Sequence, residues 1–303
     1  MRYYFGIDGG GTKSRIRLIN EHDTILYEAE GGTTNIYAGD TEAALQNLST
    51  LVLKMLVGVN LSPDAITGAC ISSAGLDRAH EKALFKEHMD SNVALSCPTY
   101  YCNDGESLLV GGLGGLEGIC LIAGTGSLGI GRLENGKVVR AGGLGYMLGD
   151  EGSAFWLSHE AIKRILRSIE GRDLKTGMLD DLLDFYQFTT EKQFIGLLHK
   201  DLRKSVIASS AAIITEHARR GDPLALDIIE RGVLELSHLV RSVIVRLPEI
   251  SNRQIVFSGG VLEHDEFIKA RLIENLHTGF PDFRVTPRKS DAATGSCLLA
   301  KQL

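Results

Sequence analysis

Residues 3–14 read YYFGIDGGGTKS, a glycine run that leads into threonine and lysine and suggests a phosphate-binding loop. The apolar segment 3–7 and the alternating segment 14–18 both predict strands. A P-loop or a dinucleotide fingerprint would instead place its glycines at the start of a helix. The glycines therefore connect two strands of a meander whose third strand is predicted at 24–29. A glycine hairpin that binds no ligand would have the same local pattern.

The same pattern occurs a second time, at residues 118–141. A strand at 118–122, a glycine–threonine turn and a strand at 128–133 are followed by a tight turn and a third strand at 138–141. A duplicated hairpin is more specific than either copy alone, because two hairpins with inward-facing N–H groups can hold a polyphosphate between two lobes.

The composition excludes several classes of function. The chain has 303 residues, 44% of them apolar, and a net charge of −6, which gives no basic footprint for nucleic acid. No apolar run reaches the ~18 residues of a membrane span. The five cysteines form neither a CxxC pair nor a Cys/His metal spacing, which favours reduced thiols and a cytoplasmic location.

Helices alternate with strands around the two meanders. Apolar periodicity, caps and glycine turns predict helices that begin after 40 and at 105, further helices at 81–89, 152–169, 223–247, 264–277 and 292–303, and strands at 69–72, 99–102, 254–257 and 283–286. Because the repeat divides the chain, we expect an N-terminal lobe at 1–115 and a C-terminal lobe at 116–287.

Five motifs, taken in this order, carry a family resemblance. They are GIDGGGTKS at 6–14, Asn103-Asp104 at a strand end, LIAGTGS at 121–127, GGLGYMLGDEGSAFWLSHEA at 142–161 and FSGGV at 257–261. Over essentially its whole length the chain resembles the N-acetylglucosamine kinase branch of the BadF/BadG/BcrA/BcrD ATPase family, within the hexokinase, actin and Hsp70 superfamily. The resemblance implies a two-lobed α/β fold of the actin-like ATPase (ribonuclease H-like) type, with duplicated lobes and ATP in the cleft. It also implies a C-terminal helix, at about 288–303, that returns to the first lobe, and a homodimer.

The resemblance assigns ATP to the two hairpins and to a third glycine turn that lies against the adenosine. The ATP-binding residues are then Gly10, Gly11, Thr12, Lys13, Gly124, Thr125, Gly126, Ser127, Gly259 and Gly260. Asp8 ends a strand beside the glycines, where a carboxylate can hold Mg²⁺ through water. Asp8 could equally be a turn aspartate that bonds its own backbone, and Lys13 a solvated hairpin lysine.

Asp104 is the expected catalytic base. It ends an apolar strand at the mouth of the expected cleft, where a carboxylate could accept the proton of a sugar hydroxyl as that oxygen attacks phosphorus. The alternative from the residues alone is a cap for the helix that begins at Gly105, because aspartate is common at that position.

The resemblance also predicts a sugar site. Its residues are Asn35, Asp104, Thr125, Gly143, Leu144, Gly145 and Asp150, and the role of the neighbouring Glu151 is left open. Asn35 also fits an ordinary turn residue, and Asp150 the start of a helix. Animal relatives carry tryptophan where this chain has Leu144, which leaves the substituent on the sugar open.

The sequence therefore predicts an ATP- and Mg²⁺-dependent kinase that phosphorylates the 6-hydroxyl of N-acetylglucosamine, N-acetylmuramic acid or glucosamine. Two alternatives stay open: an ATPase that activates a 2-hydroxyacyl-CoA dehydratase, and a sugar sensor without catalysis. The first would need exposed cysteines beside glycine at a dimer interface, and the second could dispense with Asp104. A kinase of the ROK group is disfavoured, since its cysteine-rich zinc signature is absent from the sequence.

Overall fold

The first glycine hairpin lies at the centre of a five-stranded sheet in the computed structural model, which describes residues 1–199 and 203–303. The strand order is β3-β2-β1-β4-β5, with β1 antiparallel to β2 and parallel to β4. The strands are β1 (Tyr3–Gly9), β2 (Lys13–Asn20), β3 (Ile25–Gly32), β4 (Ile66–Ser73) and β5 (Thr99–Cys102). In this register Asp8 lies between Arg15 of β2 and Ser72 of β4.

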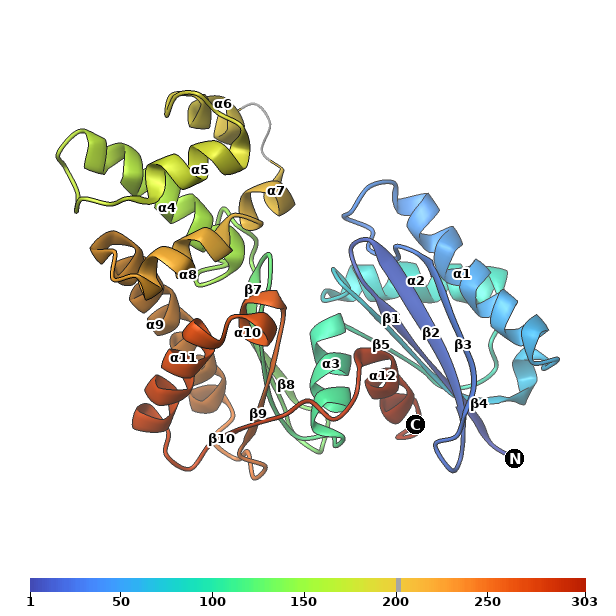
Figure 1. Ribbon diagram of the computed structural model, residues 1–303. Coiled ribbons are helices and arrows are strands. Elements are labelled where there is room, and N and C mark those ends of the chain that lie inside the picture. The colour runs from blue at the N-terminus through green and yellow to red at the C-terminus, as the bar shows by residue number, and fades with distance from the viewer. Residues whose placement is uncertain (200–202) are drawn as a thin grey trace. The chain divides into compact units, whose positions relative to one another are not determined.

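Four helices cover this first sheet (Figure 1). They are α1 (Thr41–Gly58), α2 (Ala79–Asn92), α3 (Asp104–Leu113) and α12 (Ala292–Ala300), and a 3₁₀ turn, Pro63–Ala65, precedes β4. Side chains alternate across a strand, so Phe5 and Ile7 of β1 join the apolar core under α1 and α2. Gly6 of the same strand faces α12 on the opposite side.

Helix α12 approaches its neighbours at backbone distance. A Cβ added to Gly295 would lie 1.8 Å from the carbonyl oxygen of Ser107 in α3, and one added to Gly6 would lie 2.4 Å from the amide nitrogen of Cys297. Ser296 donates from its hydroxyl to the carbonyl of Ile7, at 3.0 Å. The last helix of the chain is therefore fixed against the central strand of the first sheet.

The second sheet repeats the order of the first. Its strands run β8-β7-β6-β9-β10, and they are β6 (Gly118–Ala123), β7 (Ser127–Arg132), β8 (Val138–Gly142), β9 (Gln254–Ser258) and β10 (Arg284–Thr286). In both sheets the first strand of the meander pairs in parallel with a later strand. The predicted duplication of the α/β motif is confirmed.

The second unit carries more helices than the sequence patterns predicted. Its helices are α4 (Ala154–Ile169), α5 (Met178–Tyr186), α6 (Gln193–His199), α7 (Lys204–Ala208), α8 (Ala211–Arg219), α9 (Pro223–Arg246), α10 (Gly260–His264) and α11 (Glu266–Gly279). The four from α5 to α8 were not anticipated. The single helix predicted at 264–277 is wrong in its start, because Asp265 ends α10 and caps α11 by accepting from the N–H groups of Phe267 and Ile268.

The chain divides into two compact units. The first comprises 1–118, 131–138 and 287–303, and the second 119–130 and 139–286. The segment 131–138 belongs to the first unit, which a single boundary near residue 115 does not describe. Arg132 explains this membership, because it bonds the buried carboxylate of Glu106 in α3 at 2.9 Å and the carbonyl of Leu116 at 2.8 Å. No helix in the described residues is long and apolar enough to cross a bilayer.

Replacing Gly295 by alanine should test the close packing of α12. Because the new methyl group would meet the backbone of α3, we expect the free energy of unfolding to fall by about 3 kcal/mol, near the upper end for overpacked sites. Gly279→Ala is the matched control, since a Cβ there meets nothing within 4 Å, and it should stabilise by about 0.5 kcal/mol. Urea unfolding of the full chain measures both, and equal stabilities would contradict the packing.

Candidate active site

The first hairpin has a three-residue loop, 10–12, between β1 and β2. Gly10 closes it by donating its N–H to the carbonyl of Lys13 at 2.9 Å, and its own carbonyl accepts from the hydroxyl of Thr33 at 2.8 Å. Gly9 permits this arrangement, since a Cβ there would lie 2.0 Å from the hydroxyl of Thr34. The hairpin is thus held by the segment that follows β3, which also carries Asn35.

Lys13 pairs across to β3, the strand next to its own. Its ammonium group lies 2.8 Å from a carboxylate oxygen of Glu30, and both side chains are largely exposed. Exposed pairs of this kind contribute about 0–1 kcal/mol, so the pair would not prevent Lys13 from turning to a phosphate. Its assignment to ATP remains a prediction.

The second hairpin also has a three-residue loop, 124–126, between β6 and β7. Gly124 donates its N–H to the carbonyl of Gly126 at 2.9 Å, as Gly10 does across the first hairpin. Ser127 is buried and turned inward: its N–H donates to a carboxylate oxygen of Asp150 at 3.3 Å, and its hydroxyl to the carbonyl of Glu151 at 2.7 Å. Ser127 therefore shapes the hairpin from within the unit.

Asp150 is a buried residue whose carboxylate contacts the second hairpin. Only 4% of the residue is exposed, its φ of +64° lies in the left-handed region, and its second oxygen lies 3.2 Å from the ammonium group of Lys204. Lys204 stands 5.2 Å from the centre of the Tyr146 ring. Sequence analysis missed Lys204, because a lysine in a segment without a motif gives no signal of such a partner.

The loop predicted to pass its backbone along the sugar lies next to this hairpin in the second unit. Gly143 and Gly145 adopt positive φ angles of 65° and 85°, and Leu144 between them is 65% exposed. Gly143 N–H donates to the carbonyl of Ser127 at 2.9 Å, and its carbonyl accepts from the guanidinium group of Arg140. The loop is thus anchored on one side and presents an uncovered apolar side chain.

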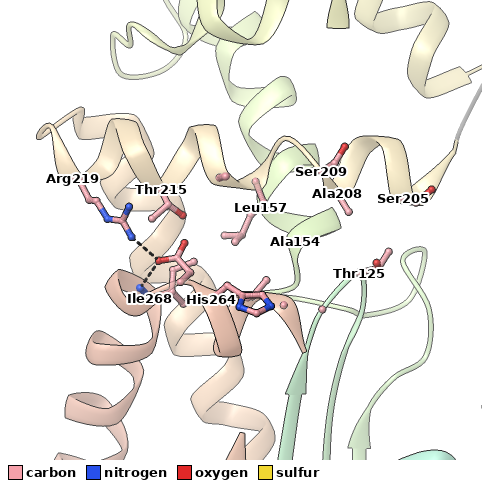
Figure 2. Close-up of a pocket in the computed structure, with 16 residues that line it drawn as sticks. Thr125, Ala154, Leu157, Ser205, Ala208, Ser209, Thr215, Arg219, His264 and Ile268 are labelled. Atoms are coloured by element: carbon pink, nitrogen blue, oxygen red, sulfur yellow. Dashed lines mark hydrogen bonds and ion pairs between the residues drawn. The ribbon is translucent and has the colours of Figure 1, made fainter. Parts of the chain in front are cut away.

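A cavity of about 510 Å³ opens beside the second hairpin (Figure 2). Gly124 and Thr125 line one side, and the third glycine turn contributes Gly260. Gly259 has a φ of +89°, and a Cβ there would lie 2.5 Å from the Ala123 carbonyl, so only glycine lets the turn approach β6 so closely. The predicted residues Gly124, Thr125 and Gly260 therefore border one cavity, whose volume is in the range of small-molecule sites.

Part of the cavity wall comes from α7 and α8, two helices that the sequence patterns did not predict. Arg219 of α8 donates to Asp265 at 3.3 Å, and Figure 2 shows Arg219 at the opposite side of the cavity from Thr125. Leu157 and Ile268 supply apolar wall, and the small residues of α7 and α8 leave room. The further lining residues are Ala154, Ser205, Ala208, Ser209, Ala211, Ala212, Thr215, Val261 and His264.

Asp8 has an unusual charge environment in the first unit. Burial and the negative charge of Asp291 together raise its pKa from 3.8 to about 6, and Arg15 only partly offsets them. Asp291 itself is partly buried, which opposes ionisation, but bonds from Arg17 and from Thr294 lower its pKa to about 2. Among the described residues no group of three His, Cys, Asp or Glu side chains could form a metal cage by itself. A desolvated carboxylate beside a second negative charge fits a cation held mainly by phosphate oxygens and water.

Asp104 is the first residue of α3, and the cap is its neighbour. Asn103 has extended backbone and accepts from the N–H of Gly105 at 3.0 Å with its side-chain oxygen. One carboxylate oxygen of Asp104 also lies 3.1 Å from that N–H. The helix therefore has a cap without Asp104, which weakens the interpretation of Asp104 as a purely structural residue.

Asn35 takes part in the turn that follows β3. Its side-chain oxygen accepts from the N–H of Tyr37 at 2.9 Å, and its own N–H donates to the hydroxyl of Thr33 at 3.1 Å. The turn role that the sequence allowed is thus present. A sugar hydroxyl could still bond the amide nitrogen or the second lone pair of that oxygen.

Known proteins match the chain over nearly its full length. The model of the BadF/BadG/BcrA/BcrD ATPase family matches residues 5–300. The N-acetylmuramic acid/N-acetylglucosamine kinase of Clostridium acetobutylicum is 30% identical, over 99% of both chains. The glucosamine kinase of Vibrio cholerae is 27% identical, over 99% of this chain and 96% of that one. A solved structure from Chromobacterium violaceum, assigned as an N-acetylglucosamine kinase, has a TM-score of 0.74, with 25% identity over 99% of both chains.

Two α/β units, each with a glycine hairpin at the head of its meander, define the actin-like ATPase fold, and these matches confirm the predicted fold class. The chain belongs to the BadF/BadG/BcrA/BcrD ATPase family.

Replacing Asp8 by asparagine should make the ligand-free protein more stable in a pH-dependent way. The folded pKa lies above the unfolded one, so the contribution of Asp8 to stability is present at low pH and is lost as pH rises through about 6. The full shift corresponds to at most about 3 kcal/mol. We therefore expect Asp8→Asn to raise Tm by several degrees at pH 8 and by about half as much at pH 5, where the unfolded state has ionised and the folded state has not. Calorimetry at both pH values measures this, and an equal shift at the two would refute the assignment.

Proposed function

We propose that this chain, a sugar kinase of its family, transfers the γ-phosphoryl group of ATP to the 6-hydroxyl of N-acetylglucosamine or a close relative, with Asp104 as general base. The relatives named as N-acetylmuramic acid, N-acetylglucosamine and glucosamine kinases support the substrate class. One observation carries the proposal most directly: the second glycine hairpin borders a cavity of nucleoside size. The proposed phosphate loop and the proposed adenosine pocket are therefore adjacent within one unit.

Phosphoryl transfer depends on positioning and charge neutralisation more than on covalent help from the protein. The N–H groups of Gly11, Thr12, Thr125 and Gly126 lie in the two loops and are the expected donors to phosphate oxygens. Asp8 is the residue that would hold Mg²⁺, which supplies charge neutralisation at the phosphates when bound. Asp104 would accept the proton of the sugar hydroxyl.

On the sugar side, the proposal uses Asn35 in the first unit and Asp150 with the 143–145 loop in the second. Asp150 already accepts an N–H and pairs with Lys204, so a sugar hydroxyl would bind a carboxylate that is held in place. The dehydratase-activator alternative is not favoured, because Cys70, Cys102, Cys120 and Cys297 are buried. Cys97 is partly exposed, but its neighbours are Ser96 and Pro98 rather than glycine.

The substrate class can be tested with the purified protein and ATP. We expect phosphorylation of N-acetylglucosamine, N-acetylmuramic acid or glucosamine at the 6-position, with turnover that requires Mg²⁺, and at least ten times less with glucose. Coupled ADP release followed by NMR of the product measures both rate and position. Slow ATP hydrolysis that no amino sugar accelerates would refute the kinase and favour a sensor or an activator.

The role of Asp104 can be tested by Asp104→Asn, which keeps the size of the side chain and removes its basicity. We expect turnover to fall by roughly 10²–10⁴-fold, as for loss of a general base, with the affinities for sugar and ATP changed far less. Because Asn103 is the cap of α3, Tm should change by no more than a few degrees.

Asp40→Asn is the matched control for this change. Asp40 caps α1 in the same unit by accepting from the N–H of Glu42 at 3.0 Å, and asparagine caps helices about as well as aspartate. The control should keep turnover within twofold of wild type. A stable Asp104→Asn protein with near-normal turnover would remove Asp104 from the mechanism.

A further inference from the structure

Tyr37 combines two properties that seldom occur together in one side chain. The residue is 59% exposed, yet its hydroxyl donates to the carboxylate of Glu81, which is completely buried. An exposed aromatic side chain is usually free to rotate, whereas the Tyr37 ring is held by the hydrogen bond of its hydroxyl group. The bond raises the pKa of the Tyr37 phenol, which keeps the donor protonated.

The ring is also held along one side. Tyr37 lies against Gly75, since a Cβ on that glycine would be 2.7 Å from a ring carbon. The same Cβ would be 3.0 Å from the side-chain oxygen of Asn35, so ring and amide lie together over Gly75. Gly75 has a φ of +82°, which residues other than glycine rarely adopt, so the close contact of Tyr37 and Asn35 with this residue depends on glycine.

Glu81 connects this ring to the loop after β4. Its carboxylate accepts from the N–H groups of Asp77 and Arg78, at 2.7 and 2.6 Å, and from the guanidinium group of Arg78. These bonds, set against the burial that opposes ionisation, lower its pKa to about 2. Asp77 in turn accepts from the side chain of Asn103, the residue before Asp104, at 3.3 Å. One buried carboxylate thus connects the Asn35 turn, the loop after β4 and the start of α3.

We propose that Tyr37 is a further sugar-binding residue, whose exposed ring packs against the apolar C–H face of the hexosamine beside Asn35, and that Glu81 positions it. The inference rests on the proposed function, because it takes Asn35 and Asp104 as the sugar side of the first unit. An aromatic face is negative and attracts the weakly positive C–H groups of a pyranose ring. A ring that is already fixed loses little conformational entropy on binding, so its contact contributes more to affinity.

Two substitutions separate the ring from its tether. Tyr37→Ala removes the ring, and we expect the KM for N-acetylglucosamine to rise about 10-fold with the KM for ATP unchanged within twofold. Tyr37→Phe keeps the ring and removes the hydroxyl, which donates to Glu81 and accepts from the guanidinium group of Arg78 at 3.3 Å. The bonds of Glu81 to the N–H groups of Asp77 and Arg78 remain, and the sugar KM should rise about threefold. Calorimetric titration of the sugar without ATP should show the same order of affinities.

Tyr100→Phe is the matched control. The Tyr100 hydroxyl donates to the buried carboxylate of Glu106 at 3.0 Å in the same unit, so the variant loses a bond of the same kind away from Gly75. It should leave the sugar KM within twofold of wild type.

The outcomes distinguish this inference from the proposed function. If the wild-type protein phosphorylates the sugar and Tyr37→Ala keeps a normal sugar KM, the ring contact is wrong and the kinase stands. If Tyr37→Phe behaves as wild type while Tyr37→Ala does not, the ring binds but the positioning role of Glu81 is wrong. Sugar and ATP KM values that rise together with a fall in Tm would overturn the inference as a general loss of structure. A wild-type protein that neither binds nor phosphorylates an amino sugar would overturn the proposed function and this inference together.

Discussion

The close packing of α12 is the constraint on which the first unit depends. Gly111 and Gly295 let α3 and α12 approach so closely that a methyl group on either would enter the other's backbone. Ser296 then bonds the carbonyl of Ile7, and Ser72 bridges to it from β4, so three elements share one buried hydroxyl cluster. Asp8 follows Ile7 and Asp104 begins α3. The two carboxylates assigned to the chemistry are thus attached to the elements that α12 holds together, and neither depends on a flexible loop for its position.

Each glycine hairpin is stabilised from within its own unit, and by different means. Thr33 fixes the first hairpin through the carbonyl of Gly10, whereas Asp150 fixes the second through the N–H of Ser127. In both cases the fixing segment also carries residues assigned to the sugar. The residues proposed for the sugar and those proposed for phosphate are therefore linked by hydrogen bonds in each unit, so a displacement of one group would displace the other.

Elements bounded by glycine turns or helix caps could be predicted from the sequence, whereas elements without such residues could not. Both hairpins, most strands and the capped helices α1 and α9 were predicted, since their turns and caps have specific residue requirements. Helices α5 to α8 form from short apolar stretches of the sequence that have no clear caps. Two of these helices, α7 and α8, supply much of the cavity wall. Lys204 was missed for the same reason. The sequence suggested Asp104 as a possible cap, whereas the backbone geometry puts Asn103 at the cap and Asp104 in the first turn of the helix.

The ionised form of Asp8 is disfavoured in the ligand-free fold, and a bound cation would remove this electrostatic penalty. Its carboxylate is partly buried beside Asp291, whose charge is retained by Arg17 and by its own role as the cap of α12. Loss of the negative charge of Asp291 would cost stability, because the same residue caps α12, the helix that packs against the first sheet. The repulsion is therefore a consequence of the packing that orders the unit. A divalent cation near Asp8 would turn this repulsion into attraction, so the packing of α12 and the proposed binding of Mg²⁺ would be linked through one carboxylate.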